Sequence, residues 1–462
     1  MIYKEISKIS SSFSVTLSKS ESRMDPHYYY PEFVSTYSKL LKISKHEIRD
    51  FFAVSTGKSP PNSYSSDGIP FVRIQNLTPF GVELDDIVYV ERTYISKSDI
   101  INPNDILITI TGATIGKLSI NQLDNGLSAC SDIAILTPRD DLDENLIYYL
   151  YGVLQTSYMF KLFWKGVFGV SNGHLSPKYI KRLPIPLLSE DSPITIGKKL
   201  KESIKKKLEA KKKKEEIDTL FAKYLPQNFE VPTEISFVYK KSSCANERRN
   251  DPKTFSPRLV AYIQKLRGFG YKIGTLDPLK NGDIHRGIQP EYHANGSIPV
   301  IKTRDVNDSP IDWGSTSKTD INFYQKNKRA QIPQNALLVT STGEGSWGRT
   351  SISDKSEAIA DGHITIIPID EALIDPYYVC AFLWTEYSKI QYYKRVRGCT
   401  GQTEIYPFDI KTIEVPRLEN NIETKIGNDL RDYIQLSGVS KNYHQQAMSE
   451  LEQLLSLKGG ES

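Results

Sequence analysis

The sequence predicts an α+β protein with two homologous mixed α/β domains, separated by two long antiparallel helices, in a pseudo-two-fold internal repeat. Two observations predict this fold class. An ordered series of phrases occurs twice along the 462-residue chain at a nearly constant offset. Each series is followed by a long stretch of good helix formers that carries regularly spaced apolar residues.

The repeat opens with RMDPHYYYPEF, Arg23 to Phe33, which corresponds to RNDPKTFSPRL, Arg249 to Leu259. Both phrases contain Arg-x-Asp-Pro, then an aromatic residue, then a second proline. The later matches keep the same order at offsets of 226 to 232 positions. The longest of them are Asn102–Ile120 with Ile332–Ile352 and Ser176–Leu188 with Tyr406–Leu418. Ordered agreement of this extent is typical of a tandem duplication.

The predicted segments are 1–190 for the first domain, 191–226 for a central helix, 227–418 for the second domain and 419–462 for a C-terminal helix. Short β-branched runs bounded by Gly, Pro, Asn and Asp predict strands in both domains. Asp143–Gln155 predicts a helix capped by Asp143. Its counterpart is Asp375–Gln391, with Asp375 as cap and Pro376 in the first helical position.

The segment Thr195–Leu225 predicts a helix about 45 Å long that ends before Pro226. Its buried face is expected to consist of apolar residues four positions apart, which are Ile196, Leu200, Ile204 and Leu208. The second helix is expected over Ile422–Leu457, with a weaker middle around Gly438.

The two helical segments carry opposite charge. Residues 194–225 contain 11 Lys and 5 acidic residues, and residues 419–457 contain 3 Lys or Arg and 6 acidic residues. Complementary charge favours pairing of the two helices, and an antiparallel pair would place the domains at opposite ends. The alternative is a solvated basic helix, or one that faces DNA phosphates.

Composition excludes several classes of protein. Hydrophobic residues make up 39% and charged residues 25% of the chain, as in ordinary globular proteins. The sequence contains no run of about 18 apolar residues, so no membrane span is predicted. The N-terminus lacks the apolar core of a secretory signal, so a cytoplasmic protein is expected. Four scattered cysteines do not predict a zinc site or a disulfide framework. The net charge of +4 does not by itself indicate a nucleic-acid partner.

Several phrases resemble the DNA-specificity (S) subunit of type I restriction-modification enzymes. They are GIPFVRIQNLTPFG, GATIGK, GHLSPKYIKRLPIPLL and GCTGQTEIYPFDIKTIEVPRL. The likeness extends from Arg23 to Leu455. The chain departs from the pattern at Gly401-Gln402-Thr403, for which the first half has GVSNGHLSP instead, so we expect the loop and the bases read there to differ.

The resemblance implies a non-catalytic subunit. Residues 1–190 and 227–418 would be target-recognition domains, each reading one half of a bipartite double-stranded DNA target. The helices would bind two adenine-methylating modification subunits, and motor-nuclease subunits would complete a restriction complex. No cofactor or metal is expected in this chain, because S-adenosylmethionine would belong to the modification subunit.

The candidate DNA-binding residues lie in the polar, glycine-containing loops. Glycine lets the backbone approach phosphate, and the flanking polar side chains can reach base edges. In the first half the candidates are Lys58, Ser59, Arg73, Gln75, Asn76, Thr111, Thr114, Lys117, Ser171, Asn172 and His174. In the second half they are Arg286, Gln289, Lys302, Arg304, Asp305, Ser341, Glu344, Ser346, Trp347, Arg349, Arg395, Arg397, Gln402 and Thr403. The alternative for each loop is an ordinary surface turn.

Other motifs predict no chemistry. Thr56-Gly57-Lys58-Ser59 is not a phosphate loop, because Phe52 stands where the first glycine is needed. His363, Asp361 and Asp132 are too few for a metal site, and a capped or buried polar residue is the favoured interpretation. Tyr28–Tyr30 is expected to pack against the sheet at the entry to the domain, and stacking on DNA is the weaker alternative.

Other functions remain open from the sequence alone. A lone methyltransferase would need an Asp/Asn-Pro-Pro-aromatic motif, which is not found, and no convincing nuclease pattern occurs. A coiled-coil protein adaptor would predict no salt-sensitive DNA binding. The chain could also be the specificity subunit of a related system in which cutting and modification are combined.

Overall fold

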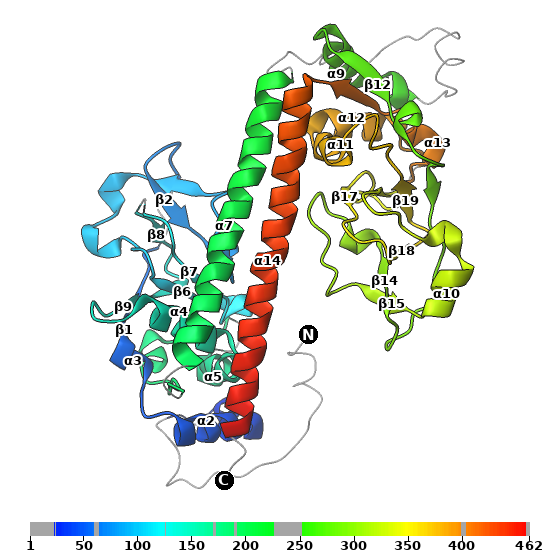
Figure 1. The fold of residues 1–462 in the computed structure, drawn as a ribbon. Helices are drawn as coiled ribbons and strands as arrows, with labels where there is room; N and C mark the ends of the chain where they lie inside the picture. The colour runs from blue at the N-terminus through cyan, green and yellow to red at the C-terminus, as the bar shows by residue number, and fades with distance from the viewer. Residues whose placement is uncertain are drawn as a thin grey trace. The chain divides into compact units, whose positions relative to one another are not determined.

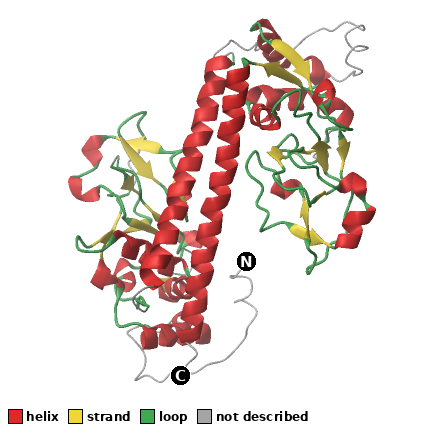
Figure 2. Ribbon diagram, in the orientation of Figure 1, coloured by secondary structure: helices red, strands yellow, loops and turns green. Residues whose placement is uncertain are grey.

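The computed structural model describes residues 23, 25–59, 64–124, 126–169, 172–188, 192–225, 252–398 and 403–458. The chain divides into two compact units, Met1–Lys207 with Val439–Ser462, and Leu208–Gly438. Each unit contains helices and strands (Figure 2). Each also contains part of the two long helices, α7 (Ser192–Tyr224) and α14 (Asn420–Lys458), drawn green and red in Figure 1. The units therefore divide within both helices.

The first unit is built on a four-stranded antiparallel sheet of order β1-β9-β6-β7. These strands are β1 (Phe52–Thr56), β9 (Ile133–Pro138), β6 (Ile106–Thr109) and β7 (Leu118–Ile120). An outer sheet of order β5-β2-β8 comprises Val88–Val90, Ile69–Val72 and Ser128–Ala129. The short pairs are β3 (Leu77–Thr78) with β4 (Gly81–Val82) and β10 (Val167–Phe168) with β11 (His174–Leu175).

Both faces of the central sheet are buried. Along β6, Ile106 and Ile108 pack into the core with the helices, while Leu107 packs into the core with the outer sheet. This alternation follows from the two-residue period of a strand. The faces of the central sheet are therefore not available for contacts with other molecules, whereas the loops at the ends of its strands are.

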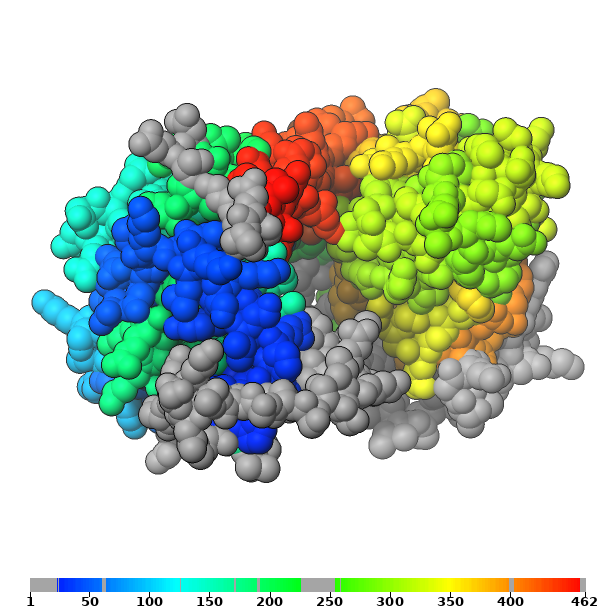
Figure 3. Space-filling view, turned by 90° about the horizontal axis from the view of Figure 1, so that it is seen from below, coloured from blue at the N-terminus to red at the C-terminus, as the bar shows by residue number. Residues whose placement is uncertain are grey.

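The helices of the first unit are α2 (Pro31–Ile43), α3 (Ile48–Phe51), α4 (Glu144–Gln155), α5 (Ser157–Gly166) and α6 (Pro177–Ile180). Helix α2 lies at the surface, within the dark blue atoms of Figure 3. The predicted helix 143–155 is confirmed, and Asp143 caps it by accepting the Asn145 N–H at 2.9 Å.

The second unit repeats this topology, so the predicted duplication is confirmed. Its central sheet has the order β13-β19-β16-β17 and its outer sheet has the order β15-β14-β18. The strands are β12 (Lys272–Thr275), β13 (His285–Arg286), β14 (Ile298–Ile301), β15 (Ser317–Thr319), β16 (Leu337–Thr340), β17 (Thr350–Ile352), β18 (Ile359–Ala360), β19 (Ile364–Ile367) and β20 (Glu414–Arg417). The helices are α9 (Pro257–Gly268), α10 (Ile321–Lys326), α11 (Pro376–Leu383), α12 (Glu386–Arg395) and α13 (Pro407–Ile410).

The repeat extends to single hydrogen bonds. The Tyr149 hydroxyl donates to the Pro186 carbonyl at 2.9 Å, and the Tyr378 hydroxyl donates to the Pro416 carbonyl at 2.6 Å. Asp375 caps α11 through the Tyr377 N–H at 2.9 Å, as predicted. Matching buried hydrogen bonds of this kind are typical of a copied fold unit.

The predicted helix 375–391 is wrong in one respect, because two helices occupy it. Helix α11 ends at Leu383 and α12 begins at Glu386. The Thr385 hydroxyl donates to the Phe382 carbonyl at 2.7 Å, which gives the backbone an alternative to the helical bond.

The two long helices are antiparallel within each unit, which confirms that they pair. In the first unit Lys199 meets Glu450 at 2.6 Å, and the Ser203 hydroxyl donates to the Ser440 carbonyl at 2.7 Å. In the second unit Lys213 meets Asp429 at 3.0 Å. Residue numbers thus rise in α7 while they fall in α14.

The expected second helix is confirmed, including its weaker middle, whereas the buried face expected for the first helix is wrong at Leu208. Helix α14 continues through Gly438, although glycine costs about 1 kcal/mol in a helix, because packing of one face supplies most helical stability. Leu208 is exposed, whereas Ala210 and Ile217 are buried. A strict four-residue repeat drifts around a helix of 3.6 residues per turn, so the buried face passes to these residues. Helix α7 also begins three residues before Thr195, and Pro226 lies outside the described residues.

The entry segment packs against a helix and not against the sheet that we expected. Tyr28 is 3% exposed, and the Lys165 Nζ of α5 lies 3.0 Å from its ring centroid. His27 Nε2 hydrogen-bonds the Trp164 carbonyl of α5 at 2.8 Å. The Lys165 Nζ also donates to the Tyr28 carbonyl at 2.9 Å, so ring, imidazole and backbone of this segment all contact α5. No helix in the described part of the chain is both long and apolar enough to cross a membrane.

Asp105→Asn should stabilise the first unit at alkaline pH. Asp105 is 1% exposed, and burial raises its pKa from 3.8 to about 6. The folded state therefore binds the proton more tightly, so stability falls as pH rises between about 4 and about 6 and stays lower above that range. Asparagine retains an acceptor for the Asn102 N–H, and Ala336 occupies this position in the second copy.

We expect the free energy of unfolding of Asp105→Asn to rise by about 2 kcal/mol at pH 8, with a flatter pH dependence, in urea titrations. The exposed Asp141→Asn serves as the control and should behave as wild type. A variant that is less stable than wild type at pH 8 would contradict this prediction.

Asp429→Ala should destabilise the second unit. Asp429 is buried and accepts from Lys213 at 3.0 Å and from Lys425 at 2.9 Å. Its loss should lower the free energy of unfolding by about 1–3 kcal/mol, because two ammonium groups lose their buried acceptor. Asp432→Ala removes a half-exposed carboxylate 3.4 Å from Lys213 and should cost less than about 1 kcal/mol. Equal losses in urea titrations would show that burial of the carboxylate is unimportant.

Candidate nucleic-acid interface

The loops at one end of each central sheet are joined by backbone hydrogen bonds. In the first domain the Ile110 N–H donates to the Asp132 carbonyl at 2.9 Å, and the Leu175 N–H donates to the Ile110 carbonyl at 2.8 Å. In the second domain the Ser341 N–H donates to His363, and the Ile405 N–H donates to Ser341, both at 2.8 Å. Three loops from distant parts of the sequence therefore meet at the same edge in both domains.

In the first domain this edge brings together several predicted residues. Thr111 forms a β-bridge with His174, and Thr114 and Asn172 are exposed in the two loops on either side of that bridge. Lys58 and Ser59 follow strand β1 and are exposed, with Lys58 paired to Asp99. The predicted Ser171 lies outside the described residues.

The turn that contains Arg73, Gln75 and Asn76 is organised from within. Asn76 is buried, and its Oδ1 accepts the Arg73 N–H at 2.9 Å. Arg73 and Gln75 both hydrogen-bond Asp86. Lys117 reaches the same turn, where its Nζ donates to the Ile74 carbonyl at 3.0 Å. Asn76 thus shapes the turn, and the partly exposed Arg73 and exposed Gln75 face outward from it.

Asp305 has the same role in the second domain. Its Oδ2 accepts the Lys302 N–H at 2.9 Å, and burial raises the pKa of this carboxyl group. The intervening Arg304 side chain is 63% exposed and makes long contacts of 3.3 to 3.5 Å with Asp305, Ser315 and Ser317. Arg304 is therefore the cation of this turn that is most accessible to a phosphate.

A cluster of polar side chains lies beside this turn. The Tyr292 hydroxyl donates to Asp361 at 3.0 Å, and Gln289 lies 3.4 Å from that hydroxyl. Lys302 Nζ sits 3.7 Å from the Tyr292 ring centroid. Asp361 is buried and accepts the His363 N–H at 2.8 Å, as the interpretation of this region as a capped or buried polar group predicts. Tyr292, which is 44% exposed, was missed because no glycine flanks it.

The Gly343–Arg349 loop has an unusual backbone. Gly343, Gly345 and Gly348 have φ values of 96°, 74° and 79°, which only glycine adopts readily. Glu344 is exposed at its tip, while the Ser346 hydroxyl donates to the Thr342 carbonyl at 2.8 Å. The predicted Ser341 is fully buried, and its Oγ lies 2.6 Å from Thr365 Oγ1.

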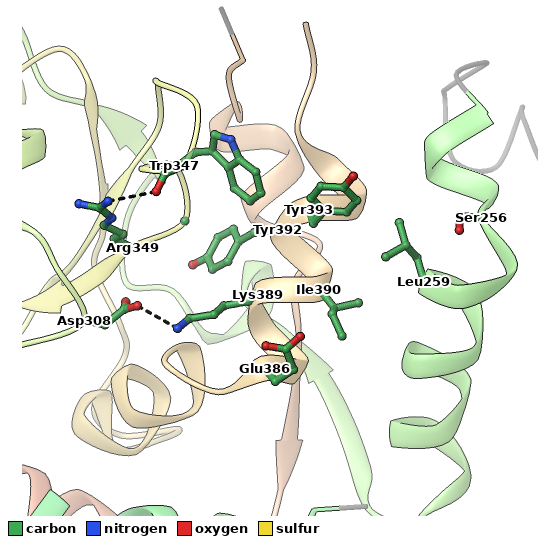
Figure 4. A pocket seen from close by; sticks show the side chains of 12 residues that line it. Ser256, Leu259, Asp308, Trp347, Arg349, Glu386, Lys389, Ile390, Tyr392 and Tyr393 are labelled. Atoms are coloured by element: carbon green, nitrogen blue, oxygen red, sulfur yellow. Dashed lines mark hydrogen bonds and ion pairs between the residues drawn. The ribbon is translucent and has the colours of Figure 1, made fainter. Parts of the chain in front are cut away.

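A cavity of about 730 Å³ adjoins this loop (Figure 4). Trp347 and Tyr393 lie at one end of it, with ring centroids 5.9 Å apart. Arg349 donates to the Gly345 carbonyl at 3.0 Å, and Lys389 meets Asp308 at 3.4 Å. The wall thus combines aromatic rings with one ion pair and one arginine that is hydrogen-bonded to a neutral carbonyl.

Arg395 and Arg397 bind α13 and the residues that follow it. Arg395 Nε donates to Thr412 Oγ1 at 2.7 Å. Arg397 makes two hydrogen bonds to Asp409, at 2.9 and 2.8 Å, and lies 4.9 Å from the Phe408 ring centroid. The predicted Gln402 lies outside the described residues. These arginines therefore tie the end of α12 to Asp409 and Thr412.

Two residues of this loop region were missed by the sequence argument. Glu404 forms β-bridges with Thr342 and Arg397, and its carboxylate pairs with Arg286. Tyr406 lies 5.1 Å from the Arg286 guanidinium. The predicted Thr403 is adjacent, and its carbonyl accepts the Gly343 N–H at 3.1 Å. Their place directly after the Gly-Gln-Thr phrase was the signal that could have found them.

Two of the four cysteines lie in the described part of the chain. Cys130 and Cys380 are buried free thiols, and burial raises the pKa of both. Among the described residues, no group of three or more His, Cys, Asp or Glu side chains is arranged to hold a metal ion.

Comparison with known families identifies the class of protein. The family described as "Type I restriction modification DNA specificity domain" matches residues 42–219 and 271–446, once in each half of the chain. The two matches cover well over half of the sequence. The chain therefore belongs to this family.

Its role within that class follows from the family. The protein is a DNA-recognition subunit of the type I restriction-modification kind. Family membership gives no support to the coiled-coil adaptor or to the related combined system. No curated protein matches the chain.

Solved structures of similar proteins are also found. The S subunit of a type I restriction-modification system from M. genitalium is 13% identical, with 90% of this chain and 94% of that chain covered and a TM-score of 0.46. A chain from a structure of type I R-M complex assembly and conformational transition is 13% identical, with 90% and 95% covered and a TM-score of 0.31. The HsdS subunit from Thermoanaerobacter tengcongensis is 11% identical, with 90% and 94% covered and a TM-score of 0.27.

Arg304→Ala should weaken DNA binding without changing the sequence that is preferred. We expect this exposed guanidinium to contact phosphate, so affinity should fall for all sequences alike, and the slope of log K against log salt should fall by about one. Fluorescence anisotropy at several salt concentrations measures both quantities. Arg49→Ala is the control, because Arg49 is 60% exposed on α3, at the opposite end of strand β1 from the loops. An unchanged slope for Arg304→Ala would contradict the assignment.

Proposed function

We propose that the two domains each read one half of a bipartite double-stranded DNA target through the loops at the end of their central sheets. The observation that carries this proposal is a contrast between the two domains at that edge. Their backbone hydrogen bonds are equivalent, but the side chains at equivalent positions differ. Thr111 is bridged by His174, while Thr342 is bridged by Glu404. Donor and acceptor groups on side chains discriminate base pairs in the major groove, so different side chains read different sequences.

The backbone of the same loops suits contact with phosphate. Glycines with positive φ occur in both copies, at Gly112 and Gly116 and at Gly343, Gly345 and Gly348. Successive amides in such conformations form concave sites that attract anions. Phosphate contacts of this kind orient a protein on the duplex and leave sequence discrimination to the side chains.

The chain acts in the cytoplasm as a subunit without a catalytic centre of its own. Two modification subunits bind it through α7 and α14 and supply S-adenosylmethionine and the adenine methylation, and motor-nuclease subunits add restriction. The absence of an Asp/Asn-Pro-Pro-aromatic motif from the sequence supports the assignment of methylation to a partner.

The test is co-expression with a modification subunit from the same organism. The purified complex is incubated with a library of random duplexes, and the methylated molecules are sequenced. We expect a consensus of two short blocks separated by a gap of fixed length, and no methylation by either subunit alone. Methylation or cleavage by the isolated chain, or a single continuous consensus, would overturn the proposal.

Exchange of residues 250–418 for those of another family member should change one block of the consensus only. Each domain has its own cores and its own loop edge, so the side chains that read one block lie within one domain. The measurement is the same library selection with the chimaeric complex. The reciprocal exchange of residues 23–188 is the matched control and should change the other block. A chimaera that alters both blocks would contradict the assignment of one block to each domain.

A further inference from the structure

The two domains place different residues at one pair of equivalent positions. Arg286 occupies the position that Thr56 has in the first domain, because each ends the first strand of the sheet directly before a glycine. Glu404 occupies the position of His174, because each forms the β-bridge to the threonine that follows the central strand. The second domain therefore has a charged pair where the first has a hydroxyl group and an imidazole.

The Arg286 guanidinium is held by three consecutive residues. It pairs with the Glu404 carboxylate, and its Nη2 donates to the Ile405 carbonyl at 2.9 Å. Its Cζ lies 5.1 Å from the Tyr406 ring centroid. Contacts from a carboxylate, a carbonyl and a ring fix both the position and the plane of the fork, which lowers the entropy lost when it binds a second partner.

Glu404 is suited to hold the Arg286 guanidinium because it is an anion. Partial burial favours the neutral acid, but hydrogen bonds from Tyr406 and Arg286 and the charge of Arg286 together lower the pKa of Glu404. A hydrogen bond between ionised partners is roughly twice as strong as one between neutral groups. The pair is accessible, since the Arg286 side chain is 23% exposed and the Glu404 side chain is 29% exposed.

The pair lies within the loop edge. Glu404 bridges Thr342, whose hydroxyl lies 2.8 Å from His363 Nδ1, and Thr403 accepts the Gly343 N–H beside it. An arginine fork matches the O6 and N7 acceptors of guanine, and this contact is the commonest specific contact in the major groove. Threonine and histidine present no such fork at the equivalent place in the first domain.

We propose that Arg286 is a specificity-determining residue that reads a guanine in the half-site of the second domain, and that Glu404 is the positioning residue that orients it. The inference rests on the proposed function, since it assigns one base of one half-site. It also implies that the guanine preference at this position depends on the planar fork and not on positive charge alone.

The experiment uses the complete complex with its modification subunits and the random-duplex selection. One position of the block read by the second domain should be guanine in wild type. Arg286→Gln should reduce that preference roughly 10- to 100-fold and leave the first block unchanged. Arg286→Lys keeps the charge and an ion pair with Glu404, and it should lose the same preference. Glu404→Gln should reduce the preference at that one position by a smaller factor.

Arg417→Gln is the matched control. Arg417 on β20 makes two hydrogen bonds of 3.0 Å to Glu423. The substitution therefore breaks an Arg–Glu pair of the same chemistry in the same domain. Its consensus should equal that of wild type. Weaker binding to all sequences with the guanine preference intact, in Arg286→Lys as well as in Arg286→Gln, would reduce the pair to a structural brace and overturn the inference. A wild-type complex without a two-block consensus would instead overturn the proposed function.

Discussion

The close approach of two backbones at Gly57 and Gly287 determines where the interface lies. A Cβ atom on Gly57 would stand 2.3 Å from the Ala129 carbonyl oxygen, and one on Gly287 would stand 2.0 Å from that of Ala360. Only glycine lets the chain leave the first strand of the central sheet across the last strand of the outer sheet. This crossing joins the two sheets and directs the residues that follow into the loop edge.

Because this junction consists of backbone, the side chains around it are free to differ between the copies. The N–H of Ile110 and that of Ser341 make equivalent bonds, yet their acceptors belong to Asp132 in one domain and His363 in the other. Main-chain hydrogen bonds do not depend on the side chain, so they hold the loop in both domains as long as each residue can adopt the required φ and ψ. A duplicated scaffold can therefore carry two recognition surfaces without a separate solution to the folding problem for each, which is what the reading of two unlike half-sites requires.

Local and repeated features of this fold could be predicted from the sequence, and long-range partners could not. The duplication, the caps at Asp143 and Asp375 and the two long helices follow from spacing and residue type. The packing of Tyr28 against α5 and the pairing of Arg286 with Glu404, 118 positions apart, depend on which segments meet in three dimensions. Glycine and polarity pointed to loops that meet at one edge of each sheet, but they could not separate the buried Asn76 and Ser341 from their exposed neighbours.

For the long helices, too, the sequence predicts the pairing but not the residues that pack. Their opposite net charges correctly indicate that they pair, but most exposed ion pairs contribute little, and the packing is set by apolar residues. Ile196, Leu200 and Ile204 share a core with Leu451 and Leu455, and Ile217 and Phe221 share one with Ile426 and Leu430. Each unit thus binds its own stretch of both helices into its own core. Any change in the length of the helices must keep both of these packed ends in register, since one residue of slip turns a helix by about 100° and would expose the buried face.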